Sequence, residues 1–343
     1  MPIKAGPMLA LGMSGSTPRR AQRALSLDAP ERAVPRRNGG LERSLRAGRR
    51  VVVVEARPPT GPDLEPLAQA AQMLSEHVDA IQLTDMPFAT PHVANLAAGA
   101  RLRMDGHEVV LNITCRDRNI IAQQGALLGA AALGINSVFC IRGDEPGVGD
   151  HPHATGVFET SGLELVRLAK RLRNDSSYLS GRSFTPAPAL FVGAAFAPHA
   201  TYGGGAREMA RLKCEAGADF LVTQPLCDIE TPAQIMSAVR DLGETFVLVG
   251  VGPVTTLETL EALQMSEEVY VPRQLADDLQ NCRPEQRIEV GMRHALSVVE
   301  SALGSGAHGI LIYPFDSGLE QTIELARRIA ARIDEYASHC SDS

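Results

Sequence analysis

Short apolar runs recur along the chain from residue 51 onward, and a helical pattern follows each of them. We expect strands at residues 51–55, 80–84, 109–114, 137–141, 190–196, 219–223, 246–250 and 309–313. We expect helices at residues 63–76, 91–104, 119–132, 160–173, 205–216, 231–241, 256–264 and 318–337. The strands are continuous apolar runs, which are typical of a parallel sheet buried on both faces. Eight such units in about 290 residues predict an α/β fold with a single (β/α)8 (TIM) barrel.

Two stretches depart from this pattern. Residues 142–158 are polar and rich in Gly and Pro, which predicts an active-site loop after the fourth strand. Residues 265–304 predict a helical insertion before the eighth strand, with Glu285 to Leu303 as its long helix. We therefore expect one catalytic barrel domain over residues 49–340.

The start of the chain has a different composition. The first fifty residues hold ten arginines and Lys4, against the three acidic residues Asp28, Glu31 and Glu42. Such a segment buries too little apolar surface to offset the entropy lost on ordering, so we expect a flexible extension over residues 1–48. A transit peptide, or a segment that folds over the barrel, are the alternatives.

Charge and composition exclude several classes of partner. A net charge of −7 and an aromatic content of 4% argue against nucleic acid, and no apolar run is long enough for a membrane span. The six cysteines are scattered without a C-x-x-C pair, which indicates reduced thiols in a cytoplasmic protein. Carboxylates do not cluster around His151, His153 or His199, so no metal site is expected.

Polar residues follow the strands at the points where they end. Glu55 follows the first strand, Thr84 the second and Asp144 the fourth. Because the carboxyl ends of barrel strands meet at one end, these residues predict a single pocket. A carboxylate that closes an apolar strand loses water on one side, which raises its pKa and favours a protonated general acid at Glu55. The alternative is a solvated Glu55 that pairs with Arg57.

Three loop motifs carry further candidates. In the Arg142-Gly143-Asp144 turn, Gly143 lets a ligand approach the backbone, Asp144 offers an acceptor and Arg142 offers a charge for a phosphate or ribose. The alternative is an ordinary turn with a local ion pair.

The second motif runs from Thr114 to Asn119. Thr114 or Asp117 can cap a helix that begins near Arg118, and Arg116 and Arg118 can face a phosphate-bearing cofactor. The third motif is Thr223-Gln224, in which the Gln224 amide has the donor and the acceptor needed to hydrogen-bond a pterin or flavin ring. The alternative is a hydrogen bond from Gln224 to the end of the neighbouring strand. No G-x-G-x-x-G follows a strand and no P-loop is present, so a nucleotide cofactor would lie on the barrel.

Together these motifs resemble the methylenetetrahydrofolate reductase family of flavin-containing (β/α)8 barrels, over about residues 50–335. The resemblance depends on the order and spacing of Glu55-x-x-Pro58-Pro59, Gly61-Pro62-Asp63, Thr114-Cys115-Arg116-Asp117-Arg118-Asn119, Leu127-Leu128-Gly129-Ala130, Arg142-Gly143-Asp144, Ala216-Gly217-Ala218-Asp219-Phe220, Thr223-Gln224-Pro225 and Gly306-Ala307-His308-Gly309.

This resemblance implies FAD-dependent reduction of 5,10-methylenetetrahydrofolate to 5-methyltetrahydrofolate, or the reverse step in methyl catabolism. The electrons would come from NADH, NADPH or a protein donor. Glu55 would protonate N10 of the folate and open its five-membered ring, and Asp144 would hold the pterin and tune the flavin. Gln224, Thr223 and Leu257 would contact the substrate. The residues implied for the flavin and its phosphates are Thr84, Asn112, Thr114, Arg142, Gly143, Asp144, Ala195, Phe196, His199 and Lys213.

Some positions depart from the family pattern. Asn112 replaces a common His, Leu257 or its neighbour Thr256 replaces an aromatic that stacks on folate and nicotinamide, and Gly203 and Met209 lie where polar flavin contacts are usual. The alternative function is therefore a catalytically silent member that binds folate or a partner protein within a larger complex. A homo-oligomer is expected for either function.

Overall fold

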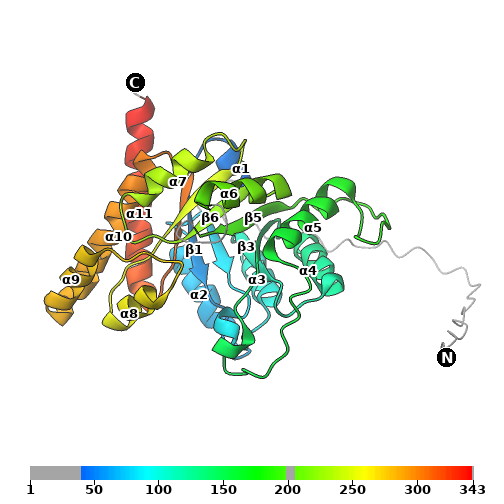
Figure 1. The fold of residues 1–343 in the computed structure, drawn as a ribbon, viewed down its shortest axis with the longest axis horizontal. Coiled ribbons are helices and arrows are strands. Elements are labelled where there is room, and N and C mark those ends of the chain that lie inside the picture. Colours follow the sequence, from blue (N-terminus) through cyan, green and yellow to red (C-terminus); the bar gives the residue numbers. More distant parts are fainter. Residues whose placement is uncertain (1–39, 198–204, 342–343) are drawn as a thin grey trace, which may run out of the picture. The chain divides into compact units, whose positions relative to one another are not determined.

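The computed structural model describes residues 40–197 and 205–341, and in this part of the chain eight parallel strands form a closed barrel. The strands are β1 (Val51–Ala56), β2 (Ala80–Leu83), β3 (Val109–Thr114), β4 (Ser137–Ile141), β5 (Phe191–Phe196), β6 (Phe220–Pro225), β7 (Phe246–Val251) and β8 (Gly309–Ile312). They pair in chain order, and β8 closes the barrel on β1 with Val54 opposite Ile312. The predicted (β/α)8 barrel is thus confirmed (Figure 1).

Helices surround the strands on the outside of the barrel (Figure 1). The helices between and after the strands are α2 (Glu65–Leu74), α3 (Asn95–Met104), α4 (Ile120–Ala132), α5 (Gly162–Asp175), α6 (Gly205–Ala216), α7 (Thr231–Val239), α10 (Arg287–Gly304) and α11 (Gly318–Ser341). The remaining elements are α1 (Leu41–Arg46), α8 (Leu257–Met265), α9 (Arg273–Asn281) and the short 3-10 helices η1 (Pro87–Ala89), η2 (Pro146–Val148) and η3 (Pro284–Gln286).

The extra helices before β8 differ from the prediction in one respect. Helix α10, which we expected to be the long helix of an insertion, packs against α7, β7 and α11, and so belongs to the ring. Its buried residues Met292, Ala295 and Val299 join the main core. The insertion is instead α8 with α9, whose apolar side chains form a separate cluster around Leu260 and Leu275.

Side chains alternate along each strand between two cores. In β1, Val52 and Val54 pack outward against the helices, whereas Val51 and Val53 fill the barrel interior. Phe220 stacks on Phe191 in this interior, with the ring centroids 4.9 Å apart. Because β residues alternate in direction, the residue that follows Val53 on the interior side is Glu55.

Helix α1 closes the amino end of the barrel. Leu41 and Leu45 are buried and belong to the interior core together with Val51. The Leu41 N–H group donates to the Glu108 carboxylate over 3.4 Å. The prediction assigned residues 1–48 to a flexible extension, but the structure gives residues 41–46 a packed helix, while residues 1–39 lie outside the described residues.

Candidate functional site

Polar side chains lie at the carboxyl end of the barrel. Side chains alternate in direction along each strand, so the interior position after the last apolar one is filled by a polar residue. Asn112 follows Val110 on the interior side of β3, and Tyr313 follows Leu311 after β8. Glu55 occupies the same place on β1, with Gln82 of β2 opposite it. These strand ends therefore lie together at the carboxyl end of the barrel, where the sequence predicted a single pocket.

Glu55 has the most perturbed carboxyl group of this site. Its pKa is raised from 4.5 to about 7, chiefly because the side chain loses water; the positive charge of Arg57 opposes this rise and the negative charge of Asp144 adds to it. The carboxyl group therefore holds a proton up to neutral pH. This is the property that a general acid needs.

Tyr313 also lies at this end of the barrel and is not among the residues predicted from the sequence. Its hydroxyl group donates to the Thr223 carbonyl over 3.0 Å, and burial together with Glu55 raises its pKa well above the ordinary value. Gly250 makes room for the ring, because a Cβ there would lie 2.5 Å from the Tyr313 side chain. The signal was present, since Tyr313 follows β8 as Glu55 ends β1.

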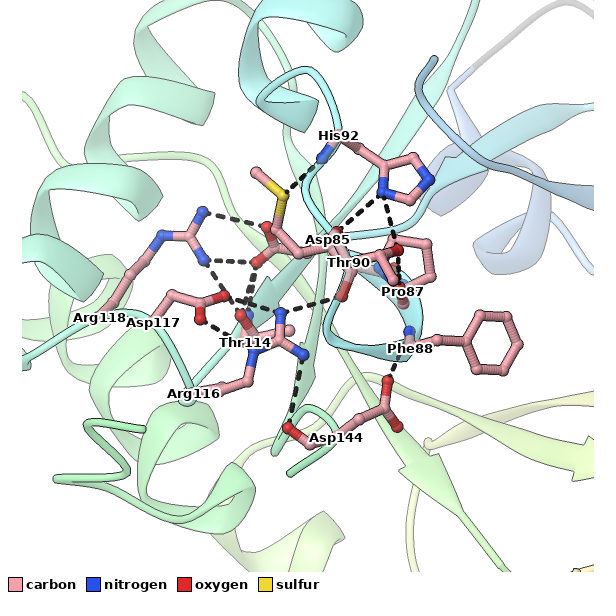
Figure 2. A network of polar contacts seen from close by, with 12 residues as sticks. Asp85, Pro87, Phe88, Thr90, His92, Thr114, Arg116, Asp117, Arg118 and Asp144 are labelled. Carbon is pink, nitrogen blue, oxygen red and sulfur yellow. Dashed lines mark hydrogen bonds and ion pairs between the residues drawn. The ribbon is translucent and has the colours of Figure 1, made fainter. Parts of the chain in front are cut away.

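A buried ion pair joins the loops that follow β2 and β3 (Figure 2). Asp85 accepts hydrogen bonds from the Thr114 N–H and hydroxyl groups, at 2.9 and 2.8 Å, and pairs with Arg118 at 2.5 Å. Arg116 binds Asp117 and the Met86 carbonyl, at 2.8 and 2.9 Å. Both arginines thus connect loops, which does not support the expectation that they face a cofactor phosphate.

The start of α4 also differs from the prediction. Asn119 caps this helix, and its side chain accepts from the Ala122 N–H group over 3.0 Å. Neither Thr114 nor Asp117 is the cap, because Thr114 binds Asp85 and Asp117 binds Arg116.

Asp144 holds the η1 loop in a strained conformation. Its Oδ2 atom accepts a hydrogen bond from the Phe88 N–H group over 2.8 Å (Figure 2). Met86, Phe88 and Ala89 have φ angles of 48°, 54° and 52°, in the left-handed region that non-glycine residues avoid. Each such residue costs on the order of 1–3 kcal/mol, so the loop needs these contacts to keep its shape.

Two residues implied for the flavin carry unsatisfied polar atoms. Among the described residues, Thr84 Oγ1 and Asn112 Oδ1 are buried without a hydrogen-bond partner. A buried unpaired polar atom is destabilising, and here both atoms belong to interior positions near the carboxyl end of neighbouring strands. A polar ring placed over this end of the barrel would satisfy them, so these residues fit a flavin.

The other candidates for the flavin have mixed surroundings. Gly143 has a φ angle of 85°, and a Cβ there would lie 3.1 Å from Thr114, so its conformational freedom serves loop packing. Arg142 is exposed, pairs with Glu145 at 2.5 Å and lies over the Phe158 ring. Thr114, as described above, already binds Asp85.

Strand β5 and helix α6 hold the remaining candidates. Lys213 donates to the Ala195 carbonyl, and burial lowers the pKa of its amine to about 8. The Phe196 side chain packs outward in the main core, so only its backbone faces the site. Met209 packs against the same core, whereas His199 and Gly203 lie outside the described residues.

The three substrate candidates differ in accessibility. The Thr223 hydroxyl group accepts from the Gly250 N–H group and donates to the Gln224 carbonyl, both over 2.8 Å, and is therefore occupied by the backbone. Gln224 is partly exposed. Leu257 packs with the cluster of α8 and α9.

Two kinds of site find no support in the described part of the chain. No group of three or more His, Cys, Asp or Glu side chains there is placed to hold a metal ion. None of the helices described combines the length and the apolar character that a membrane crossing requires.

Comparison with known proteins gives the family. The family model described as methylenetetrahydrofolate reductase matches residues 40–324. A probable methylenetetrahydrofolate reductase (NADPH) from Caenorhabditis elegans is 25% identical over 186 residues, which are 53% of this chain but only 26% of that protein.

Solved structures agree in fold. One neighbour is an uncharacterised protein from Clostridium thermocellum that is described as binding two copies of 5-methyltetrahydrofolate. It has a TM-score of 0.58 at 12% identity, and the match covers 85% of this chain and 99% of that chain. A riboflavin lyase solved with modified FMN and riboflavin has a TM-score of 0.53 at 10% identity, with 84% and 92% covered. The family match covers most of the barrel and all of the strand ends described above. The chain therefore belongs to the methylenetetrahydrofolate reductase family.

Proposed function

We propose that this protein catalyses the FAD-dependent reduction of 5,10-methylenetetrahydrofolate to 5-methyltetrahydrofolate. The observation that carries the proposal is the position of Glu55 on the interior side of β1 at the carboxyl end of the barrel, where loss of water raises the pKa of its carboxyl group to about 7. Family membership supports it, and so does the Clostridium thermocellum neighbour, whose description names 5-methyltetrahydrofolate as its ligand.

In this mechanism Glu55 donates its proton to N10 of the folate. The C–N bond to N10 then breaks, and the methylene carbon stays on N5 as an electrophile. The hydride for that carbon would come from reduced FAD, which supplies this chemistry when it is bound. Loss of water keeps Glu55 protonated, and the negative charge of Asp144 adds to this effect. Gln224 offers a donor and an acceptor to the pterin.

Thr84 and Asn112 would bind the flavin through their unsatisfied oxygen atoms, and Lys213 would act at its phosphates. The electron donor in this proposal is NADH, NADPH or another protein, and the step can run in reverse in methyl catabolism. A cytoplasmic location and a homo-oligomer remain predictions.

The visible absorption spectrum of the purified protein is the first test. We expect a flavin spectrum that 5-methyltetrahydrofolate bleaches without oxygen, and bleaching by NADH or NADPH would identify the donor. A colourless protein that binds no added FAD would refute the proposal and favour the catalytically silent alternative.

The role of Glu55 has its own test. Glu55→Gln keeps the shape of the side chain but has no proton to donate, so we expect it to abolish reduction of methylenetetrahydrofolate. Flavin content and flavin reduction by the electron donor should stay nearly unchanged, which stopped-flow measurement of the two half-reactions checks. A variant that kept most of its folate turnover would show that another group is the acid.

A further inference from the structure

One aromatic side chain at the rim of the site lies outside every core. Phe88 is 57% exposed, and Figure 2 shows its ring pointing away from the polar network of Asp85, Arg116 and Arg118. The Arg57 guanidinium lies over this ring, 4.9 Å from its centroid. The backbone under the ring has the strained conformation described above, fixed by Asp144. The chain thus holds an exposed ring in a defined place without burying it.

Arg57 differs from the other arginines of these loops in its partners. Arg116 pairs with Asp117, Arg118 with Asp85 and Arg142 with Glu145. Arg57 is exposed and forms no ion pair with a described residue. It is therefore a cation that remains available for a carboxylate from outside the chain.

The position of Arg57 and Phe88 relative to Glu55 indicates what these two side chains bind. Arg57 follows Glu55 by two residues and Asp144 binds the Phe88 backbone, so both side chains belong to the surroundings of the acid. If N10 lies at Glu55, the aromatic ring bonded to N10 begins next to the acid, and the glutamate of the folate follows one amide further out. An aromatic side chain, Phe88, and a cation, Arg57, at the rim match this order of an aromatic ring followed by a carboxylate.

We propose that Phe88 and Arg57 bind the p-aminobenzoyl-glutamate part of the folate, with Phe88 against the ring and Arg57 at the glutamate carboxylate. This inference rests on the proposed function. Aromatic contact and a charge-assisted hydrogen bond are the interactions that these two side chains offer. Both residues act in binding, so their loss should raise KM. Because Arg57 also lowers the pKa of Glu55, its loss should in addition move the pH profile of kcat upward, which loss of Phe88 should not do.

The experiment compares 5-methyltetrahydrofolate with 5-methyltetrahydropteroate, which lacks the glutamate, by calorimetric binding to the full chain. We expect the intact protein to bind the folate about tenfold more tightly than the pteroate. Arg57→Gln should remove this preference without weakening pteroate binding, and Phe88→Leu should weaken binding of both compounds. The same variants should raise KM for methylenetetrahydrofolate in turnover.

A matched control is Arg182→Gln. Arg182 also lies over an aromatic ring, 4.6 Å from the centroid of Tyr178, but in the loop that leads into β5, which belongs to the opposite end of the barrel. The Arg182→Gln variant should bind both compounds as tightly as the intact protein does. If Arg57→Gln keeps the preference, or Phe88→Leu binds as the intact protein does, the inference is wrong while the proposed function stands. If the intact protein binds neither compound, both are wrong.

Discussion

Glu55 keeps its proton to about pH 7 because the end of the barrel withholds water from the carboxylate, and the same effect makes the fold depend on pH. Between pH 4.5 and 7 the unfolded chain releases this proton and the folded chain retains it. The free energy of unfolding therefore falls as the pH rises through this window.

Replacement of this carboxyl group should consequently stabilise the protein at high pH. We expect Glu55→Gln to be more stable than the unmodified protein at pH 8, by on the order of 3 kcal/mol, and equal to it below pH 4.5. Urea unfolding at both pH values measures the difference. Glu76→Gln, at an exposed position of the same barrel, is the control and should show no such trend. A stability difference that did not change with pH would contradict the assigned environment of Glu55.

At this scale the sequence predicted positions better than partners. Glu55 was predictable because it ends an apolar strand, and the same rule applied to β8 would have found Tyr313. The partners of Arg116, Arg118 and Thr223 were not predictable, because they depend on which loop lies beside which after closure of the barrel. Their contacts with Met86, Asp85 and the Gly250 backbone join strand ends that are far apart in sequence.

The loops after β2 and β3 act as one element because Asp85 connects them. Its carboxylate is fully buried and satisfies Thr114 and Arg118 together. Removal of one member of a buried ion pair leaves the other charge uncompensated, so Asp85→Asn should lower the free energy of unfolding by about 3 kcal/mol. Under the proposed function, binding of 5-methyltetrahydrofolate should weaken in the same variant, since both loops border the candidate site.

The comparison for this prediction is Asp105→Asn. Asp105 pairs with Arg101 at 2.9 Å on the surface of α3, where water screens the charges, and its loss should change stability little. Chemical denaturation of both variants measures the contrast. Equal losses for the buried and the surface pair would show that Asp85 does not hold the loops.

Elements were predicted from the sequence more reliably than their places in the fold. All eight strands lie where the apolar runs indicated, because a strand buried on both faces has a distinct composition. The roles of α8, α9 and α10 were not separable in this way. Each has an apolar face, and only contact shows that Met292 of α10 packs in the main core while Leu260 of α8 and Leu275 of α9 pack on each other.

At the scale of the whole molecule, the barrel has one end with the candidate site and one end that α1 closes. The sequence pattern predicted the barrel itself, because an apolar run followed by a helical segment recurs eight times, once for each strand and helix of the barrel. It did not reveal α1, because a helix of six residues among arginines gives only the two apolar positions Leu41 and Leu45. The family match begins at residue 40, which agrees with a domain that includes this helix.

Changes in α1 should therefore lower the stability of the barrel without weakening binding at its other end. Leu41 and Leu45 are fully or almost fully buried, and each Leu→Ala change should cost about 2–5 kcal/mol through lost burial and the cavity left behind. The proposed function places the folate at the other end of the barrel, so the folded variants should bind 5-methyltetrahydrofolate with the affinity of the unmodified chain. Urea unfolding and calorimetric binding measure the two effects separately.

Two truncations test the domain boundary directly. A chain that begins at residue 40 retains α1, whereas one that begins at residue 49 loses it and exposes the interior residues Val51 and Phe191 to water. We expect the shorter chain to unfold at a clearly lower urea concentration than the longer one. Equal midpoints, together with neutral Leu41→Ala and Leu45→Ala variants, would place the boundary at residue 49, as the composition of the chain suggested.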